Sequence, residues 1–268
     1  MGARALRAAT GWQYIDFMVF QWLKGLASPR PGGGLGGRVP SRCAICRHWP
    51  SAPVCETCIA HFAQPTPRCL RCALPLPAGP ICGACLKNPP PLDVCLSATA
   101  YAWPWTDLIA QFKFQAQPGW AGALATLMRS SNGAEDALDT ADWVLPIPLS
   151  RQRLVERGYN PSWLLAHHLC PDKAQAQLLL KTRDTPSQHT LPRSERLANL
   201  EGAFAVDPLR AHDLRGKRLV LVDDVMTSGA SLHTAARVMR QAGAQHITAL
   251  VLARTEAHQA ADTDTLPF

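Results

Sequence analysis

Residues 219–231 read Leu-Val-Leu-Val-Asp-Asp-Val-Met-Thr-Ser-Gly-Ala-Ser, and this stretch does most to define the fold. The four apolar residues 219–222 predict a buried strand, and two adjacent carboxylates stand at its end. A turn of small and hydroxyl-bearing residues follows, and a helix is expected to begin near Ser231. Backbone N–H groups in such a turn, with the positive end of a helix behind them, form a site for an anion.

The side chains of this turn suit a sugar phosphate. Gly229 lets the main chain approach a phosphate closely. The hydroxyl groups that could donate to a phosphate belong to Thr227, Ser228 and Ser231. The carboxylates of Asp223 and Asp224 would repel a phosphate, but both could accept hydrogen bonds from vicinal sugar hydroxyls about one ribose length away from it. A strand that merely ends in a capped helix would hardly need two acids. A receiver domain also carries paired acids, but it needs a later lysine, and no lysine follows Asp224.

The chain beyond residue 92 has an α/β pattern. Apolar stretches at residues 95–101, 143–147, 178–180, 219–222 and 247–252 predict strands, and residues 105–117 and 231–242 have helical patterns. Short buried strands that alternate with helices indicate an α/β fold, with a mainly parallel sheet flanked by helices. Ligand sites in such folds lie at the carboxyl ends of the strands.

Four Cys-x-x-Cys pairs precede this domain. They are Cys43 with Cys46, Cys55 with Cys58, Cys69 with Cys72, and Cys82 with Cys85. Two such pairs supply the four thiolates of a tetrahedral zinc site, so eight cysteines suit two zinc ions, each of which stabilises a segment too short for its own core. Sequential pairing needs the shortest loops, and a cross-braced arrangement remains open.

Other uses of these cysteines are less consistent with the sequence. Disulfides require an oxidising compartment, and nothing in the sequence directs export. Iron–sulfur clusters usually show other cysteine spacings. His48 and His61 lie close by and could replace a thiolate, although eight thiols already suffice.

Composition and charge restrict the class of protein. The chain has 268 residues, of which 47% are hydrophobic and 18% charged, so a packed core is expected and global disorder is not. Residues 15–23 suggest an amphipathic helix, and no apolar run reaches the ~18 residues of a membrane span. A secretory cleavage site is also lacking, so we expect a cytoplasmic protein without a stable membrane span.

The net charge of +7 is unevenly distributed. Residues 30–87 contain seven Lys and Arg against one acid, and residues 151–218 contain twelve against seven. The intervening residues 88–150 contain two against six. Two basic regions separated by an acidic one suggest anionic partners, either phosphates or a nucleic-acid backbone.

The stretch at 219–231 resembles the phosphoribosyl pyrophosphate loop of type I phosphoribosyltransferases. The resemblance implies that Asp223 and Asp224 bind the ribose hydroxyls and that the turn binds the 5′-phosphate, with magnesium accompanying phosphoribosyl pyrophosphate. The residues that would form this site are Asp223, Asp224, Val225, Met226, Thr227, Ser228, Gly229, Ala230 and Ser231.

The chain from about residue 42 to 254 resembles the competence protein F family (ComF, also called ComFC or GntX-like), in which a double zinc ribbon precedes a phosphoribosyltransferase domain. Further segments that carry the resemblance are residues 112–114, 146–149, 156–160, 185–188 and 195–204. It departs from the family at Tyr159, where Phe is frequent, and at Pro161, where Gln is frequent. The domains implied are an N-terminal helix and linker (1–42), the double ribbon (43–88), a phosphoribosyltransferase-like domain (92–256) and a tail (257–268).

Several cations are candidates for the pyrophosphate part of the site. A stiff Pro-Ile-Pro turn at 146–148 would place three arginines near the carboxyl edge of the sheet, where guanidinium groups suit a pyrophosphate. The residues 183–199 resemble the lid of the family's fold, which closes over the site. The candidates are Lys113, Arg151, Arg153 and Arg157, with Arg193 and Arg196 in the lid.

The resemblance leaves more than one function open. One is phosphoribosyl transfer to an acceptor that no residue here identifies. Another is a module that handles single-stranded DNA in natural transformation, together with competence or DNA-processing proteins, through Trp49 and the basic residues Arg42, Arg47, Arg68 and Arg71. A third is a non-catalytic accessory role related to iron–sulfur proteins.

Overall fold

The computed structural model describes residues 41–183 and 202–256. The chain divides into two units, Met1–Pro65 and Thr66–Phe268, so the division falls between the second and third cysteine pairs. The expected helix at 15–23 and the lid arginines Arg193 and Arg196 lie outside the described residues. No helix in the described ranges has the length and apolar character needed to cross a bilayer.

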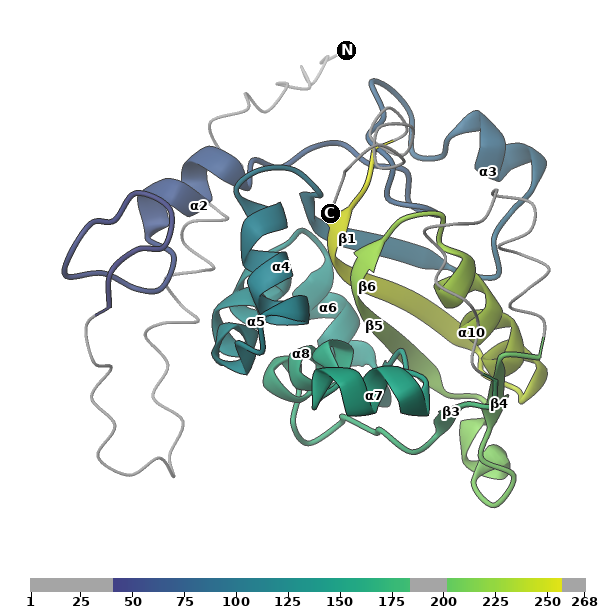
Figure 1. The fold of residues 1–268 in the computed structure, drawn as a ribbon. Helices are drawn as coiled ribbons and strands as arrows, with labels where there is room; N and C mark the ends of the chain where they lie inside the picture. The colour runs from purple at the N-terminus through teal and green to yellow at the C-terminus, as the bar shows by residue number, and fades with distance from the viewer. Residues whose placement is uncertain (1–40, 184–201, 257–268) are drawn as a thin grey trace, which may run out of the picture. The chain divides into compact units, whose positions relative to one another are not determined.

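A four-stranded parallel sheet lies at the centre of the second unit (Figure 1). Its order is β1 (Val94–Ala100), β6 (His246–Arg254), β5 (Arg218–Met226) and β2 (Trp143–Pro146). Parallel strands need crossover connections, and each pair of neighbours here is linked by helices or long segments. The predicted α/β fold with a mainly parallel sheet is confirmed.

Helices cover both faces of the sheet (Figure 1). On one side lie α5 (Ala121–Arg129), α6 (Ala134–Thr140) and α8 (Pro161–Leu169), and on the other lies α10 (Ala230–Gln241). Among the residues of this unit that the structure describes, the other helices are α3 (Gly83–Lys87), α4 (Trp105–Phe114) and α7 (Arg151–Arg157), with short 3-10 turns at Pro118–Trp120 and Ala211–Leu214. Burial on both faces explains why β5 and β6 are continuous apolar runs rather than alternating ones.

The predicted strand at 178–180 exists as β3 (Leu179–Lys181), but it does not join the parallel sheet. It pairs antiparallel with β4 (Phe204–Val206), a strand that the sequence pattern did not predict. Three residues are too few to show a period, which is why apolar character alone did not reveal the partner. Leu179 is buried while Leu180 is exposed, as expected of a strand with one face in solvent.

Strand β5 is longer than the apolar run predicts, because it continues through both acids to Met226. The reason lies in its neighbour: β6 extends to Arg254, so Asp223 and Met226 still have ladder partners in Val251 and Arg254. The two carboxylates therefore belong to the last part of the strand instead of following it.

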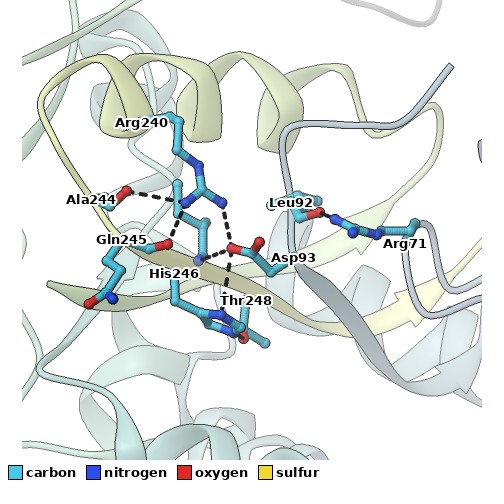
Figure 2. A network of polar contacts seen from close by, with 9 residues as sticks. Arg71, Leu92, Asp93, Arg240, Ala244, Gln245, His246 and Thr248 are labelled. Atoms are coloured by element: carbon cyan, nitrogen blue, oxygen red, sulfur yellow. Dashed lines mark hydrogen bonds and ion pairs between the residues drawn. The ribbon is translucent and has the colours of Figure 1, made fainter. Parts of the chain in front are cut away.

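The amino ends of the strands are tied together by a polar network (Figure 2). Asp93, which precedes β1, accepts hydrogen bonds from the Ile247 amide at 2.7 Å and from the Arg240 guanidinium at the end of α10. Arg240 also donates to the carbonyl oxygens of Ala244 and Gln245. Burial alone would raise the pKa of Asp93, but these donors lower it below its ordinary value. The network fixes the amino ends of the strands, opposite to the carboxyl ends where the loop after β5 lies.

Candidate functional site: two cysteine clusters and a sugar-phosphate loop

The eight cysteines form two groups of four, Cys43/Cys46/Cys55/Cys58 and Cys69/Cys72/Cys82/Cys85. The sulfur atoms of each group lie within 4.8 Å of one another. The sequential pairing is therefore the one found, and neither His48 nor His61 belongs to a group.

The spacing of the sulfur atoms matches a tetrahedral metal site. Cys43 Sγ lies 3.8 Å from Cys58 Sγ, Cys46 Sγ lies 3.6 Å from Cys55 Sγ, and Cys72 Sγ lies 3.7 Å from Cys82 Sγ. Four thiolates about 2.3 Å from one zinc ion would be ~3.8 Å apart, whereas a disulfide needs about 2.05 Å. All ten cysteines are free thiols, and each group could hold a zinc ion.

The two groups share one local backbone plan. In each, the first cysteine amide donates to the carbonyl oxygen five residues later, and a residue with positive φ follows the first pair, Arg47 (φ 66) or Ala73 (φ 55). In each, the third cysteine is the N-cap of a short helix, α2 (Glu56–Phe62) or α3, and its amide points at the first sulfur. Residues 41–62 and 67–87 are thus a structural repeat that the sequence shows only as paired cysteines.

Amide hydrogen bonds make one thiol in each group easier to ionise. Burial would raise the pKa of Cys43, but hydrogen bonds from the backbone of Cys55, Cys46 and Ile45 lower it to about 6. The same opposition lowers the pKa of Cys69 to about 7. A thiolate is the form that binds a metal ion, so the backbone of each group favours a ligand.

The second group packs into the core of the sheet unit. Cys69, Cys72 and Cys85 are buried in the same apolar cluster as Met226 of β5 and Leu232 of α10. Backbone and side-chain hydrogen bonds join the two parts: the Cys95 amide donates to Leu70 at 2.7 Å, and Arg71 donates to the carbonyl oxygen of Leu92 (Figure 2).

The loop after β5 has the geometry of an anion site. Gly229 has φ +79, and an added Cβ would lie 2.4 Å from the Met226 methyl group, so a side chain here would strain the backbone and displace that methyl group. No acceptor among the described residues is found for the backbone N–H groups of Thr227, Ser228 and Gly229. Helix α10 begins at Ala230, one residue before the predicted start. Its positive end therefore lies directly behind three available donors.

Arg254 joins the base of this loop to the second cysteine group. Its buried guanidinium donates from Nε to the carbonyl oxygen of Cys72 at 2.9 Å. From Nη1 it donates to the carbonyl oxygens of Met226 at 3.0 Å and Thr227 at 2.5 Å. One side chain thus fixes the start of the loop against the backbone of a cysteine group that could hold a metal ion.

The two acids are held by different helices. Asp223 Oδ1 accepts hydrogen bonds from Ser162 Oγ of α8 at 2.9 Å and from the Asp224 amide. Asp224 Oδ1 lies 2.9 Å from Lys113 Nζ of α4, and Asp224 is 6% exposed. Burial, and then the charge of Asp224, raise the pKa of Asp223 to about 7. A carboxylate that costs free energy to ionise is typical of a functional site.

Comparison with known proteins agrees with this arrangement. The sequence model of the phosphoribosyl transferase domain family matches residues 175–266. DNA utilization protein YhgH of Salmonella typhimurium is 32% identical over 235 residues, 81% of this chain and 98% of its own. Competence protein F of Haemophilus influenzae is 31% identical over 225 residues, 80% of this chain and 96% of its own. The chain belongs to the ComF family.

A more distant ComF relative, competence protein ComFC of Bacillus subtilis, is 26% identical over 77% of this chain and 86% of its own. Among solved structures, the allosteric regulatory enzyme of purine biosynthesis matches 49% of this chain and 25% of its own, with a TM-score of 0.32 and 18% identity. As in other ComF proteins, the sheet is a phosphoribosyltransferase domain, and the N-terminal region carries cysteine groups that fit a zinc ribbon.

The other predicted site residues differ in whether they lie near the loop after β5. Met226 and Ala230 have buried side chains in the core, so only their backbone could face a ligand. Lys113 contacts Asp224, and Arg157 lies over the ring of Phe114, 5.1 Å from its centroid. Arg151 and Arg153 are in the first turn of α7, and the structure gives neither a contact with the loop.

Three residues with a part in the site were missed by sequence reasoning. They are Ser162, Arg254 and Asn160. Asn160 caps α8 and donates to the carbonyl oxygen of Ile147 at 3.0 Å, which places Ser162 beside Asp223. Pro161 is the first residue of α8, a position that proline favours, so the departure from the family pattern is compatible with the helix. Only the Asn-Pro helix start could have indicated this from sequence.

A hollow of about 270 Å³ lies at the other end of the strands. Arg215 and Gly243, which precede β5 and β6, are among its lining residues, and no residue of the loop is. It is therefore separate from the loop after β5, the sugar-phosphate loop of residues 227–229.

Proposed function

We propose that this protein binds phosphoribosyl pyrophosphate, or a related sugar phosphate, at the loop after β5 and transfers the phosphoribosyl group to an acceptor. Its relatives named competence protein F and ComFC suggest that it acts in competence, on or beside single-stranded DNA. Catalysis would come from positioning and charge neutralisation rather than from covalent chemistry.

One observation carries this proposal: three backbone N–H groups without an acceptor among the described residues stand beside two carboxylates at the end of one strand. The N–H groups suit the 5′-phosphate and the carboxylates suit the ribose hydroxyls. In this assignment Ser162 and Lys113 hold Asp223 and Asp224 in position, and Arg254 holds the turn.

Magnesium would arrive with the diphosphate of the substrate. It prefers oxygen ligands and commonly uses one or two carboxylates together with substrate phosphates, and Asp223 and Asp224 are carboxylates of this kind. The ion would neutralise the charge of the leaving diphosphate. Lys113, the cation 2.9 Å from Asp224, would add to that neutralisation.

Isothermal titration calorimetry with phosphoribosyl pyrophosphate and magnesium tests the proposal. The wild type should bind, and Asp223→Asn/Asp224→Asn should abolish the heat of binding. A matched control is Glu135→Gln/Asp136→Asn, since these are also adjacent acids but are exposed on α6. Equal heats from the wild type and the Asp223/Asp224 variant would remove the ribose assignment.

We further propose that both cysteine groups hold zinc. Metal analysis of the purified protein should give about two zinc ions per chain. Cys46→Ser and Cys82→Ser should each lower the content by about one ion, because each residue belongs to a different group. A folded protein without metal, or one with iron in place of zinc, would refute this assignment.

A second candidate function is DNA binding by the first cysteine unit. Arg42 and Arg47 are exposed there, and Trp49 is 57% exposed, as expected of side chains that follow a nucleic-acid backbone and stack on its bases. Arg68 and Arg71 of the second group are only partly exposed, and both donate to backbone carbonyl oxygens. The proposal is therefore confined to the first unit.

A further inference from the structure

Helix α4 ends in two phenylalanines with opposite environments. Phe112 is completely buried, and its carbonyl oxygen accepts a hydrogen bond from the Tyr159 hydroxyl, which fixes the last turn of the helix. Phe114, the final residue of α4, is 65% exposed. Its ring contributes little to the core, so packing does not account for an aromatic residue there.

Two cations flank the exposed ring. Arg157 Cζ lies 5.1 Å from the centroid of Phe114, and Lys113 Nζ lies 5.7 Å from it. Both distances are within the range of a cation–π interaction, which holds the ring in place at little cost in entropy. The arrangement gives a fixed aromatic surface bordered by positive charge.

The ring also stands close to the paired acids. The ammonium group of Lys113 that borders Phe114 is the same group that lies 2.9 Å from Asp224 Oδ1. Arg157 comes from α7, which follows the carboxyl end of β2, and β2 pairs with β5 through Pro146 and Val222. Phe114 therefore lies at the carboxyl edge of the sheet, one lysine ammonium group away from Asp224.

We propose that Phe114 is the surface on which a nucleobase stacks when the attached ribose phosphate, or the ribose phosphate to which it becomes attached, occupies the loop. This inference rests on the proposed function and extends it, because it names the acceptor as a nucleobase or the base of a nucleotide. Every base has an aromatic face, so one exposed ring can accept a free nucleotide or the end of a DNA strand.

The division of contacts follows the chemistry of a nucleotide. The backbone N–H groups of the loop suit its phosphate, Asp223 and Asp224 suit its ribose, and Phe114 suits its base. Arg157 and Lys113 lie over the ring, and their charges would attract phosphates adjacent to the base. The sequence pattern indicated a base-stacking side chain only in the first cysteine unit, at Trp49, and Phe114 supplies one beside the paired acids.

The test measures three ligands with four proteins. The ligands are phosphoribosyl pyrophosphate with magnesium, the 5′-monophosphate of 2-aminopurine riboside, and a short single strand with a 5′-phosphate and 2-aminopurine at its end. The proteins are the wild type, Phe114→Ala, Phe114→Trp and Leu209→Ala, the last being an exposed apolar control in the segment between β4 and β5. The readouts are affinity and the quenching of 2-aminopurine fluorescence, which reports base stacking.

Phe114→Ala should change the affinity for phosphoribosyl pyrophosphate much less than the affinity for a base-containing ligand, since phosphoribosyl pyrophosphate has no base. It should weaken binding of at least one base-containing ligand about tenfold and remove its quenching, and Phe114→Trp should restore both. Leu209→Ala should behave like the wild type. The two base-containing ligands distinguish a free nucleotide from a DNA end.

The inference is overturned if Phe114→Ala binds and quenches both base-containing ligands as the wild type does, or if the wild type binds neither. Normal binding of phosphoribosyl pyrophosphate in the same experiment would show that the proposed function survives that failure.

Discussion

The two cysteine groups have the same local backbone plan and different surroundings. In the described part of the first unit, the buried apolar side chains are Cys43, Val54, Cys58 and Ala63. The second group instead shares one apolar cluster with β5, β6 and α10, and Arg254 connects it to the sugar-phosphate loop. The same arrangement of four cysteines can therefore have a small apolar cluster of its own in one place and form part of a domain core in another.

The difference suggests different uses for the two groups. The first unit exposes Arg42, Arg47 and Trp49, which are available to a partner. The second group uses its arginines internally, because Arg68 and Arg71 donate to carbonyl oxygens of Ala73 and Leu92. We expect the first group to govern contacts with nucleic acid and the second to govern the shape of the loop.

The largest expected effect is the loss of one metal ligand from each group. Cys85→Ser should lower the stability of the sheet unit by at least about 3 kcal/mol, because a structural zinc contributes ~10 kcal/mol or more, and this shifts its Tm by about 6–12 °C. It should also weaken binding of phosphoribosyl pyrophosphate. Cys58→Ser should leave both quantities of the sheet unit unchanged. Thermal unfolding followed by tryptophan fluorescence, together with calorimetry, measures both.

Equal shifts of the sheet-unit Tm in Cys58→Ser and Cys85→Ser would contradict the comparison. Metal content measured on the same samples is the necessary control. Each variant should retain about one zinc ion per chain, in the group that is unchanged.

Arg254→Lys should have the next largest effect. Lysine cannot donate to the carbonyl oxygens of Cys72, Met226 and Thr227 at once. A buried carbonyl oxygen that loses its donor costs about 1 kcal/mol, so the free energy of unfolding should fall by ~2–3 kcal/mol. Affinity for the sugar phosphate should fall as well, with zinc content unchanged. Arg237→Lys, an exposed position of α10, is the matched control. Wild-type affinity in Arg254→Lys would show that the metal group and the loop are independent.

Asp223→Asn should stabilise the sheet unit in a pH-dependent manner. The pKa of Asp223 is raised from 3.8 to about 7 in the folded state, so its ionisation opposes folding, fully above pH 7 and not at all below the unfolded value. Relative to the wild type, the variant should gain about 1–3 kcal/mol at pH 8, less at pH 6 and little near pH 4. Denaturant unfolding measures the difference.

Loss of metal at low pH affects the wild type and Asp223→Asn alike, so it cancels in their difference. Glu135→Gln, an exposed acid of α6, should show no such trend. A gain that is constant with pH would mean that the charge of Asp223 is not its cause.

The smallest expected effects concern DNA. Arg42→Ala and Arg47→Ala should each weaken binding of a labelled single strand a few-fold, uniformly across sequences, and reduce the slope of log affinity against log salt by about 0.7. Arg71→Ala should leave that slope unchanged, because its guanidinium is already bound to the Leu92 carbonyl oxygen. Fluorescence anisotropy over a salt series decides the matter. A smaller salt slope in Arg71→Ala, with unchanged slopes in Arg42→Ala and Arg47→Ala, would assign the nucleic-acid surface to the second group.

Local patterns predicted much of the fold. The strands β1, β2, β5 and β6 and the helix α10 lie where apolar runs and helical periodicity placed them. The strand β4 was missed and β3 was assigned to the wrong kind of sheet, because three-residue strands carry no period and their pairing joins residues far apart. The extension of β5 to Met226 was also missed, since its partner Arg254 lies on a different strand.

The site divides in the same way. The four cysteine pairs, Gly229 and the two acids are visible in the sequence, because a two-residue spacing between thiols or a strand–turn–helix motif is complete within a few residues. Ser162 and Arg254 are not visible, since an isolated serine or arginine has no local signature. The sequence also did not show which of Phe112 and Phe114 is buried and which is exposed.

By itself, the sequence determined which cysteines form groups that could hold a metal ion, and it predicted where a phosphate would bind, since both depend on neighbours along the chain. The tertiary structure decided what surrounds them: Lys113 lies 111 residues from Asp224, Ser162 lies 61 from Asp223, and Arg254 lies 182 from Cys72. Such contacts follow from the order of strands in the sheet, and that order is set by the packing of the whole domain, which no local pattern encodes.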